Sequence, residues 1–378
     1  MIYFDNAASS FPKPDSVVQA VNRALTEYGA NPGRGGHRLA KEAATVIRET
    51  RTALADFFGL DASENVWFYP NATTALNQAL KGFPFEEGDH VIATSYEHNS
   101  VRRPLEYLKK TKGIQVTYVN PDKENCKDAI KRNTKLIAAT HGSNLTGMIV
   151  PIEELGSLTK EFGVPFLVDA SQTAGVLPID MKETGIDMLA FPGHKGLLGP
   201  QGTGALLVRP SIELEPHMHG GTGAYSELLD QPEQLPERYE SGTLNTPGIA
   251  GMLAGLKEIK KMGLERILKH ESELASYCLQ GLKAIDGVRI YGPDPEVKRL
   301  GVVAFRIEEV DVQETAIILD QHYDIAVRAG LHCTPLAHES IGTADGGAVR
   351  VSFGPYNTSE EIDRFLQAVQ EIKYGLGG

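Results

Sequence analysis

Short apolar runs alternate with amphipathic segments through residues 65–208, and this alternation constrains the fold more than any other feature. The apolar runs predict strands at 65–69, 90–94, 115–119, 136–140, 166–168, 188–191 and 204–208, and the segments between them include predicted helices at 100–110 and 152–162. Strands that alternate with helices favour an α/β fold with a mainly parallel sheet. Ligands of such a sheet bind beyond the carboxyl ends of its strands.

Polar side chains follow most of these predicted strands. They are Thr73, Thr74, His98, Asn144, Asp169, Gln172, His194 and Lys195. A loop lysine and an acid at a strand end can hold pyridoxal phosphate, the lysine through a covalent bond and the acid through the pyridine nitrogen. Two hydroxyls in the first turn of a helix suit an anion. Taken singly, the lysine loop could be a surface turn and a threonine could be a helix cap, but their joint placement favours a cofactor site.

The ends of the chain follow different patterns. Residues 1–14 predict an extended arm, and helical spacing predicts helices at 16–28 and 39–58. A long helical region at 248–285 precedes predicted strands at 302–307, 325–327 and 349–353 and helices at 312–321 and 360–373. We therefore expect an arm (1–14) that packs with a small α+β domain (248–378), and a large domain (15–247).

Composition limits the classes of function. The net charge of −12 over 378 residues, without a basic cluster, argues against nucleic-acid binding. No apolar run reaches the length of about 18 residues that spans a membrane, and the start lacks signal-peptide features. Three well-separated cysteines, Cys126, Cys278 and Cys333, suit a reducing cytoplasm. His217 and His219 could suggest a metal, but no third ligand accompanies them, so we expect none.

Taken together, these motifs resemble the fold-type I, class V aminotransferase superfamily, and within it the cysteine desulfurase and selenocysteine lyase branch. The resemblance extends from residues 3–8 to 356–358. It is carried by Ala72-Thr73-Thr74, Glu97-His98, His141-Gly142-Ser143-Asn144, Val168-Asp169-Ala170-Ser171-Gln172, Gly193-His194-Lys195, Glu240-Ser241-Gly242-Thr243 and 326–333. The last segment, Ala326-Val327-Arg328-Ala329-Gly330-Leu331-His332-Cys333, resembles the short-loop group II desulfurases. The resemblance implies a large domain with a mainly parallel seven-stranded sheet and a smaller α+β C-terminal domain.

The resemblance also implies roles in holding pyridoxal 5'-phosphate. Lys195 would bond to the cofactor and later carry the Cα proton, Asp169 would pair with the ring nitrogen, and His98 would lie over the ring with an acid–base part. Gln172 would donate to the phenolate oxygen. The phosphate ligands would be Thr73, Thr74, His194 and, from the other subunit of a homodimer, Thr243. The sequence departs from the family at Pro192, which replaces a serine, so we expect a looser phosphate clamp.

For the substrate, the resemblance implies that Asn144 and Arg350 bind its carboxylate, with Ala8 and Arg328 beside them. Cys333 would take sulfur from L-cysteine as a persulfide, leave alanine, and pass the sulfur to an acceptor protein. Flanking His332 and nearby cations would then matter for its thiolate. The plainer interpretations are a surface ion pair for Arg350 and a buried structural role for Cys333. For Cys126 and Cys278 a structural role is favoured.

Three other functions stay open at this point. A selenocysteine lyase would act on L-selenocysteine and carry the same residues. An aminotransferase or another β-lyase would give Cys333 no role. A binding or scaffold protein with an inactive site is also conceivable, although Lys195, Asp169, His98 and Cys333 are all present.

Overall fold

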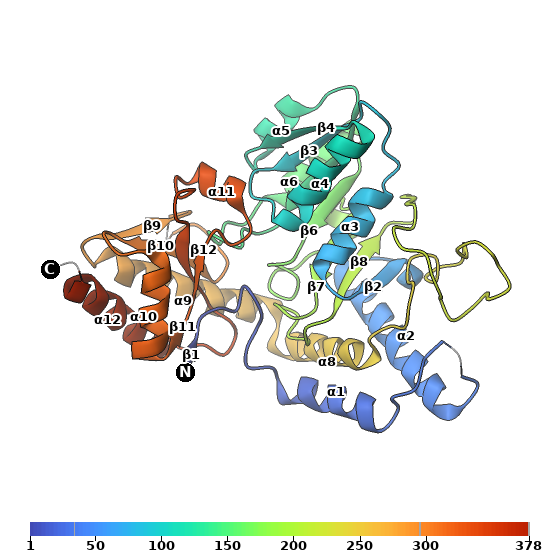
Figure 1. The fold of residues 1–378 in the computed structure, drawn as a ribbon, viewed down its shortest axis with the longest axis horizontal. Coiled ribbons are helices and arrows are strands. Elements are labelled where there is room, and N and C mark those ends of the chain that lie inside the picture. The colour runs from blue at the N-terminus through green and yellow to red at the C-terminus, as the bar shows by residue number, and fades with distance from the viewer. Residues whose placement is uncertain (34, 295, 377–378) are drawn as a thin grey trace.

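The protein is built on two main sheets of unequal size, joined by long helices (Figure 1). The computed structural model describes residues 1–33, 35–294 and 296–376. The larger sheet has seven strands, in the order β2 (Val66–Tyr69), β8 (Gly204–Val208), β7 (Met188–Pro192), β6 (Phe166–Asp169), β5 (Thr134–Thr140), β3 (His90–Thr94) and β4 (Gln115–Val119). β8 runs antiparallel to both neighbours, and the other pairs are parallel. The mainly parallel α/β sheet is therefore confirmed, with strand ends within two residues of those expected.

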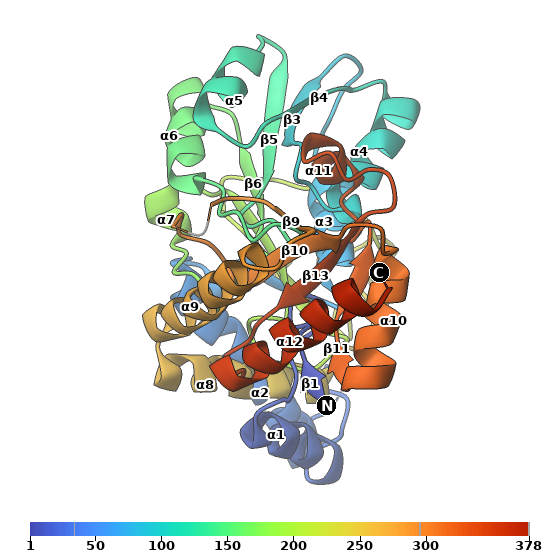
Figure 2. The same ribbon diagram turned by 90° about the vertical axis from the view of Figure 1, so that its left-hand side faces the viewer.

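Helices cover both faces of this sheet, which explains why its strands read as continuous apolar runs. On one face lie α3 (Ala72–Gly82) and α4 (Asn99–Lys112). On the other lie α2 (Arg38–Phe58), α5 (Lys123–Ala129), α6 (Ile152–Phe162) and α7 (Met181–Thr184), as Figure 2 shows for most of them. Alternate residues of a strand enter different cores: Leu189 and Phe191 of β7 pack on the α2 side, Met188 and Ala190 on the α3 side.

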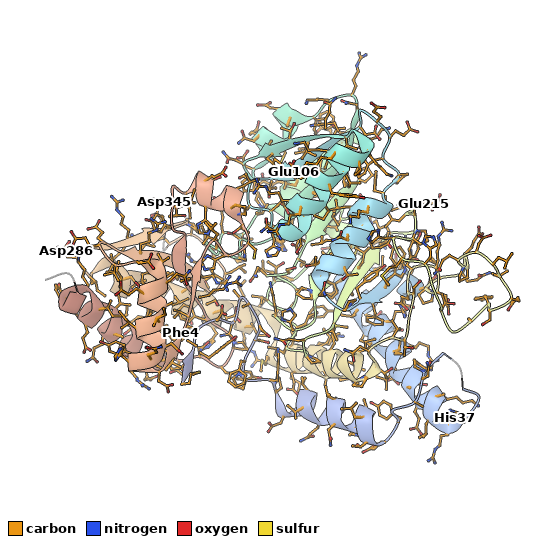
Figure 3. All side chains as sticks on the ribbon, in the orientation of Figure 1. Phe4, His37, Glu106, Glu215, Asp286 and Asp345 are labelled. Carbon is orange, nitrogen blue, oxygen red and sulfur yellow. The ribbon has the colours of Figure 1, made fainter. Side chains whose placement is uncertain are left out.

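The smaller sheet is antiparallel and has its own core. Its order is β12 (Arg328–Gly330), β13 (Ala348–Ser352), β10 (Val302–Ile307) and β9 (Val288–Tyr291). Its core is shared with α9 (Leu264–Lys283), α10 (Val312–Tyr323) and α12 (Ser359–Leu376). Phe4 of the N-terminal arm lies in this core (Figure 3), with its ring centroid 5.0 Å from that of Phe353 and 5.8 Å from that of Phe365.

The N-terminal arm forms a separate two-stranded sheet beside the smaller sheet before the chain enters the larger one. β1 (Ile2–Tyr3) pairs in parallel with β11 (Ile325–Ala326), and Asp5 forms a bridge with Ser352. The chain then forms α1 (Asp15–Thr26), which packs against α8 (Thr246–Met262). The proposed domain limits at residues 14 and 247 stay a prediction.

The long helical region expected at 248–285 is two helices, α8 and α9. Gly263, at φ +83°, separates them; this backbone conformation suits glycine because it has no Cβ. Short elements that periodicity did not predict are η1 (Ser63–Asn65), α5, α7, β9, β12 and α11 (Pro335–Ser340). None of the described helices is long and apolar enough to cross a membrane.

Candidate active site

The carboxyl edge of the larger sheet carries the side chains expected from sequence. Asp169 is the last residue of β6, and Lys195 follows β7 by three residues. Thr73 and Thr74 lie in the first turn of α3, which Asn71 caps by accepting a hydrogen bond from the Thr74 amide (2.9 Å). This turn presents hydroxyls and free backbone N–H groups, a combination that binds anions.

Lys195 is surrounded by charges from both sheets. Burial lowers its pKa to about 8; the Asp169 carboxylate opposes this shift, whereas the guanidinium groups of Arg350 and Arg328 add to it and Asp5 opposes it again. The amine can therefore exchange a proton near neutral pH, as a covalent or acid–base lysine must. The predicted cluster of Lys195, Asp169, Arg328 and Arg350 does come together in space.

His98 is the N-cap of α4 and is uncharged near neutral pH. Its Nδ1 accepts a hydrogen bond from the Ser100 amide (3.1 Å), so the proton of the neutral ring lies on Nε2. Burial lowers its pKa to about 4, with Asp169 opposing and Lys195 adding to the shift. The Ser100 hydroxyl lies 2.9 Å from His98 Nδ1 and 2.8 Å from Thr73 Oγ1, and thus links the two helix starts. Sequence reasoning missed Ser100, although it follows the Glu97-His98 motif.

Asp169 and Gln172 are fixed by short local contacts. The Asp169 Oδ1 atom accepts hydrogen bonds from the Ser171 amide (2.9 Å) and hydroxyl, which leaves its second oxygen for another donor. The Gln172 amide donates to the carbonyl of Ala7 (3.1 Å), so the arm reaches this side chain. Ala8 belongs to the same arm turn, since its amide donates to the Asp5 carbonyl (3.0 Å).

The arm also holds the lysine loop. The carbonyl of His194 accepts from the Ser10 amide (3.0 Å) and from Lys13 Nζ (2.8 Å), and the Ser10 hydroxyl donates to the Lys195 carbonyl (3.0 Å). Burial lowers the pKa of His194 to about 4, so its ring is neutral near pH 7. Ser10 and Lys13 carry no motif, and nothing in the sequence pointed to their contact with this loop.

Arg350 is buried, with 1% of its surface exposed, which contradicts the interpretation as a surface ion pair. Its Nη2 lies 2.6 Å from Asp5 Oδ1, and its Nη1 donates to the Asn144 carbonyl (2.9 Å). Its Nε is buried and has no acceptor among the described residues. An unused donor on a planar guanidinium suits a carboxylate ligand.

Cys333 lies in the turn between β12 and α11, half-buried beside a cation. Its Sγ is 3.8 Å from Arg328 Nη2, and its carbonyl accepts from the Asn99 amide (2.8 Å). His332 was expected to support the thiolate, but its ring is neutral and bonded elsewhere: burial lowers its pKa to about 3 and both nitrogens have other partners. Arg328 is therefore the cation that contacts the sulfur.

The other two cysteines are buried, and their thiols are hard to ionise. Burial raises the pKa of Cys126 to about 12 and raises that of Cys278 as well. Both observations favour the structural role expected of them.

Thr243 lies apart from the lysine cluster of its own chain. It lines a cavity of about 350 Å³ together with Arg51 and Glu240, and its hydroxyl accepts from the Asn31 side-chain amide (3.4 Å). Glu240, three residues before Thr243, forms a buried bidentate ion pair with Arg51, with both N–O distances 2.9 Å. Its contribution across a subunit interface stays a prediction.

The assembled residues fit pyridoxal phosphate. A lysine of lowered pKa lies near an aspartate, and the Nδ1 atom of His194 and the Nε atom of Arg350 are buried without partners among the described residues. A ligand with an aldehyde, a ring nitrogen and anionic groups would satisfy such atoms. Within the described ranges, no three His, Cys, Asp or Glu side chains gather as a metal site.

Comparisons with known proteins identify the family of the chain. The family model described as Aminotransferase class-V matches residues 2–365. The chain is similar to a probable cysteine desulfurase of Pyrococcus abyssi (38% identity, covering 100% of this chain and 95% of the relative) and to one of Methanothermobacter thermautotrophicus (36%, 100% and 95%). Among solved structures it is similar to an apo cysteine desulfurase from Thermococcus onnurineus NA1, with 36% identity, a TM-score of 0.93 and coverage of 99% and 95%.

Proposed function

Because the chain belongs to the class-V aminotransferase family, we propose that it is a pyridoxal-phosphate-dependent cysteine desulfurase that converts L-cysteine to L-alanine. The observation that carries this proposal is the contact between Cys333 Sγ and Arg328 Nη2, at 3.8 Å, because the same guanidinium also acts on the buried amine of Lys195. An aminotransferase needs the amine but has no use for a thiol there.

The cofactor would be held by the groups at the carboxyl edge of the larger sheet. Lys195 Nζ would bind its aldehyde, Asp169 its ring nitrogen, His98 its ring face and Gln172 its phenolate oxygen. Thr73, Thr74 and His194 would bind the phosphate, with Thr243 of a second subunit. When bound, this cofactor supplies an electron sink for the bonds broken at the substrate carbon atoms.

The chain's own residues would then bind the substrate and take its sulfur. The free Nε edge of Arg350 suits the substrate carboxylate, with Asn144, Ala8 and Arg328 nearby. Lys195 would move the Cα proton, which its lowered pKa permits. The Cys333 thiolate would attack the substrate sulfur: an S–S bond forms, the C–S bond breaks, and one thiol plus L-cysteine become one persulfide plus L-alanine.

The decisive experiment is a mass spectrum of the holoenzyme after brief exposure to L-cysteine. We expect one added sulfur on the peptide that carries Cys333 and stoichiometric alanine, and neither with Cys333→Ala. Sulfur on Cys126 or Cys278, or glutamate or pyruvate as product, would contradict the proposal.

The same variant separates the two members of the branch. Cys333→Ala should abolish turnover of L-cysteine but spare much of any activity on L-selenocysteine, because the C–Se bond breaks more easily. Equal losses on both substrates would count against this division.

The proposal extends to assembly and location. We infer a homodimer that completes each phosphate site with Thr243, a cytoplasmic location, and a protein acceptor for the persulfide. Sedimentation of the holoenzyme tests whether it is a homodimer. If Thr243 completes the phosphate site of the other subunit, a Thr243→Ala variant should bind the cofactor more weakly.

A further inference from the structure

Two consecutive residues at the reactive cysteine have left-handed backbone conformations. The φ angles are +49° at His332 and +60° at Cys333, and neither residue is glycine. Such a conformation costs about 1–2 kcal/mol for each residue that has a Cβ. The turn therefore persists because surrounding contacts hold it.

A chain of buried side chains provides part of this support from behind. His332 Nε2 lies 3.3 Å from the Arg328 carbonyl, His332 Nδ1 lies 3.4 Å from His338 Nε2, and His338 Nδ1 lies 2.8 Å from Thr343 Oγ1. The three side chains are at most 3% exposed. Burial lowers the pKa of His332 to about 3 and that of His338 to about 4, so both rings are neutral.

One set of tautomers satisfies these three contacts. A carbonyl only accepts, so His332 Nε2 carries the hydrogen and its Nδ1 accepts from His338 Nε2. His338 Nδ1 then accepts from the Thr343 hydroxyl. This chain ends on the carbonyl of Arg328, the residue whose guanidinium contacts Cys333 Sγ. Since neither end reaches the sulfur, the chain is suited to holding the turn and not to moving a proton.

Two further bonds fix the front of the turn. The Asn144 side-chain amide donates to the His332 carbonyl (2.8 Å), and the Asn99 backbone amide donates to the Cys333 carbonyl (2.8 Å). The start of α4 and the loop that follows β5 thus bind the carbonyls of both left-handed residues, while His338 and Thr343 support the His332 ring.

We propose that His338 is a positioning residue, which acts through His332 to hold the Cys333 turn with the sulfur beside Arg328. This inference rests on the proposed function, because the geometry of the turn limits turnover only if Cys333 takes the sulfur. A reacting atom displaced by about 1 Å can cost about 100-fold in rate.

The test compares holoenzymes that carry His338→Leu, His338→Gln or Thr343→Val. We expect His338→Leu to lower kcat for persulfide formation by about 10- to 100-fold while KM for L-cysteine stays within about twofold. His338→Gln should restore much of the rate, because its amide can donate to His332 and accept from Thr343. Thr343→Val removes only the outer donor and should have a smaller effect in the same direction.

Amide hydrogen exchange supplies a readout that does not depend on turnover. Exchange in residues 328–334 should be at least about tenfold faster in His338→Leu, with or without cofactor. His322→Leu is the matched control, because His322 is exposed on α10, and it should change neither quantity.

The outcomes separate the inference from the proposed function. Parental exchange and parental kcat in His338→Leu would overturn the positioning role, as would equal losses in the Leu and Gln variants. If Cys333→Ala kept its activity on L-cysteine, the proposed function would fail, whereas the exchange data would still decide whether His338 holds the turn.

Discussion

The lysine loop and the cysteine turn both lie near the guanidinium of Arg328, but they are held in different ways. The loop around Lys195 is bound mostly through its backbone: the Gly193 amide donates to the Thr203 carbonyl (2.9 Å), and the arm contacts the carbonyls of His194 and Lys195. The cysteine turn depends instead on side chains, among them His332, His338 and Asn144.

This difference sets how each region should respond to mutation. Several donors converge on the two loop carbonyls, so the loss of one side chain leaves others in place. Thr343, His338 and His332 are hydrogen-bonded one after another, so the loss of one contact leaves the next side chain without its support. We therefore expect the loop to tolerate changes around its lysine and the turn to be sensitive to changes around its cysteine.

The largest effect should come from the lysine itself. Lys195→Ala removes the only group of the loop that can bond to an aldehyde and carry the Cα proton. Turnover should fall at least about 100-fold, the lower range for a positioned acid–base group. After borohydride reduction, a mass spectrum should show cofactor on the parent protein and not on the variant. Cofactor attached to another residue of the variant would show that Lys195 is not needed for its attachment.

The next effect concerns the front of the cysteine turn. Asn144→Ala removes the donor to the His332 carbonyl, so we expect about a tenfold loss of kcat. The free energy of unfolding should fall by only about 1 kcal/mol, the value of one hydrogen bond. Stopped-flow kinetics and urea unfolding measure the two quantities. Unchanged amide exchange of the turn in this variant would argue against support from the loop that follows β5.

A third prediction concerns Glu271, a buried residue of α9 beside the lysine loop. Glu271 lines a small pocket with Gln172, Lys195 and Ser352, and burial raises its pKa to about 8. The folded state then binds more protons than the unfolded state between about pH 4.5 and 8, so the free energy of unfolding should fall as pH rises through this window.

Glu271→Gln should remove this dependence. Between pH 5 and pH 8 the parent should lose about 3 kcal/mol more stability than the variant, as urea unfolding at both pH values would measure. Identical pH profiles would mean that Glu271 is ionised in the folded protein.

The smallest effect should come from the support of the lysine loop. Lys13→Met keeps the apolar stem but removes the Nζ donor to the His194 carbonyl, and Ser10 still binds that carbonyl. We expect kcat to stay within about twofold of the parent in steady-state assays. A loss of kcat as large as that expected for His338→Leu would show that the lysine loop is as sensitive to substitution as the cysteine turn.

The sequence predicted the larger sheet well because its strands, apart from the edge strand β4, are mostly buried. Such strands are continuous apolar runs, as 188–191 and 204–208 illustrate, and the polar residues that follow them stand out. Lys195, Asp169 and His98 were found for this reason. The break at Gly263 was missed because both helices carry helical spacing through it.

The contacts between distant segments could not be predicted in the same way. The Asp5–Arg350 pair joins residues 345 positions apart, and no local pattern marks it. The neutral state of His332 follows from its burial against His338, whereas the sequence shows only a histidine next to a cysteine. Thr243 was identified from a motif alone, and its own chain places it in another cavity.

The burial of two cysteines makes the third one chemically addressable. The sequence holds three, and Cys126 and Cys278 are fully buried with thiols that resist ionisation. A maleimide dye applied to the native protein should therefore label Cys333 alone, without any cysteine being replaced. The fluorescence of a dye on Cys333 could then be used to follow the binding of an acceptor near this residue in real time.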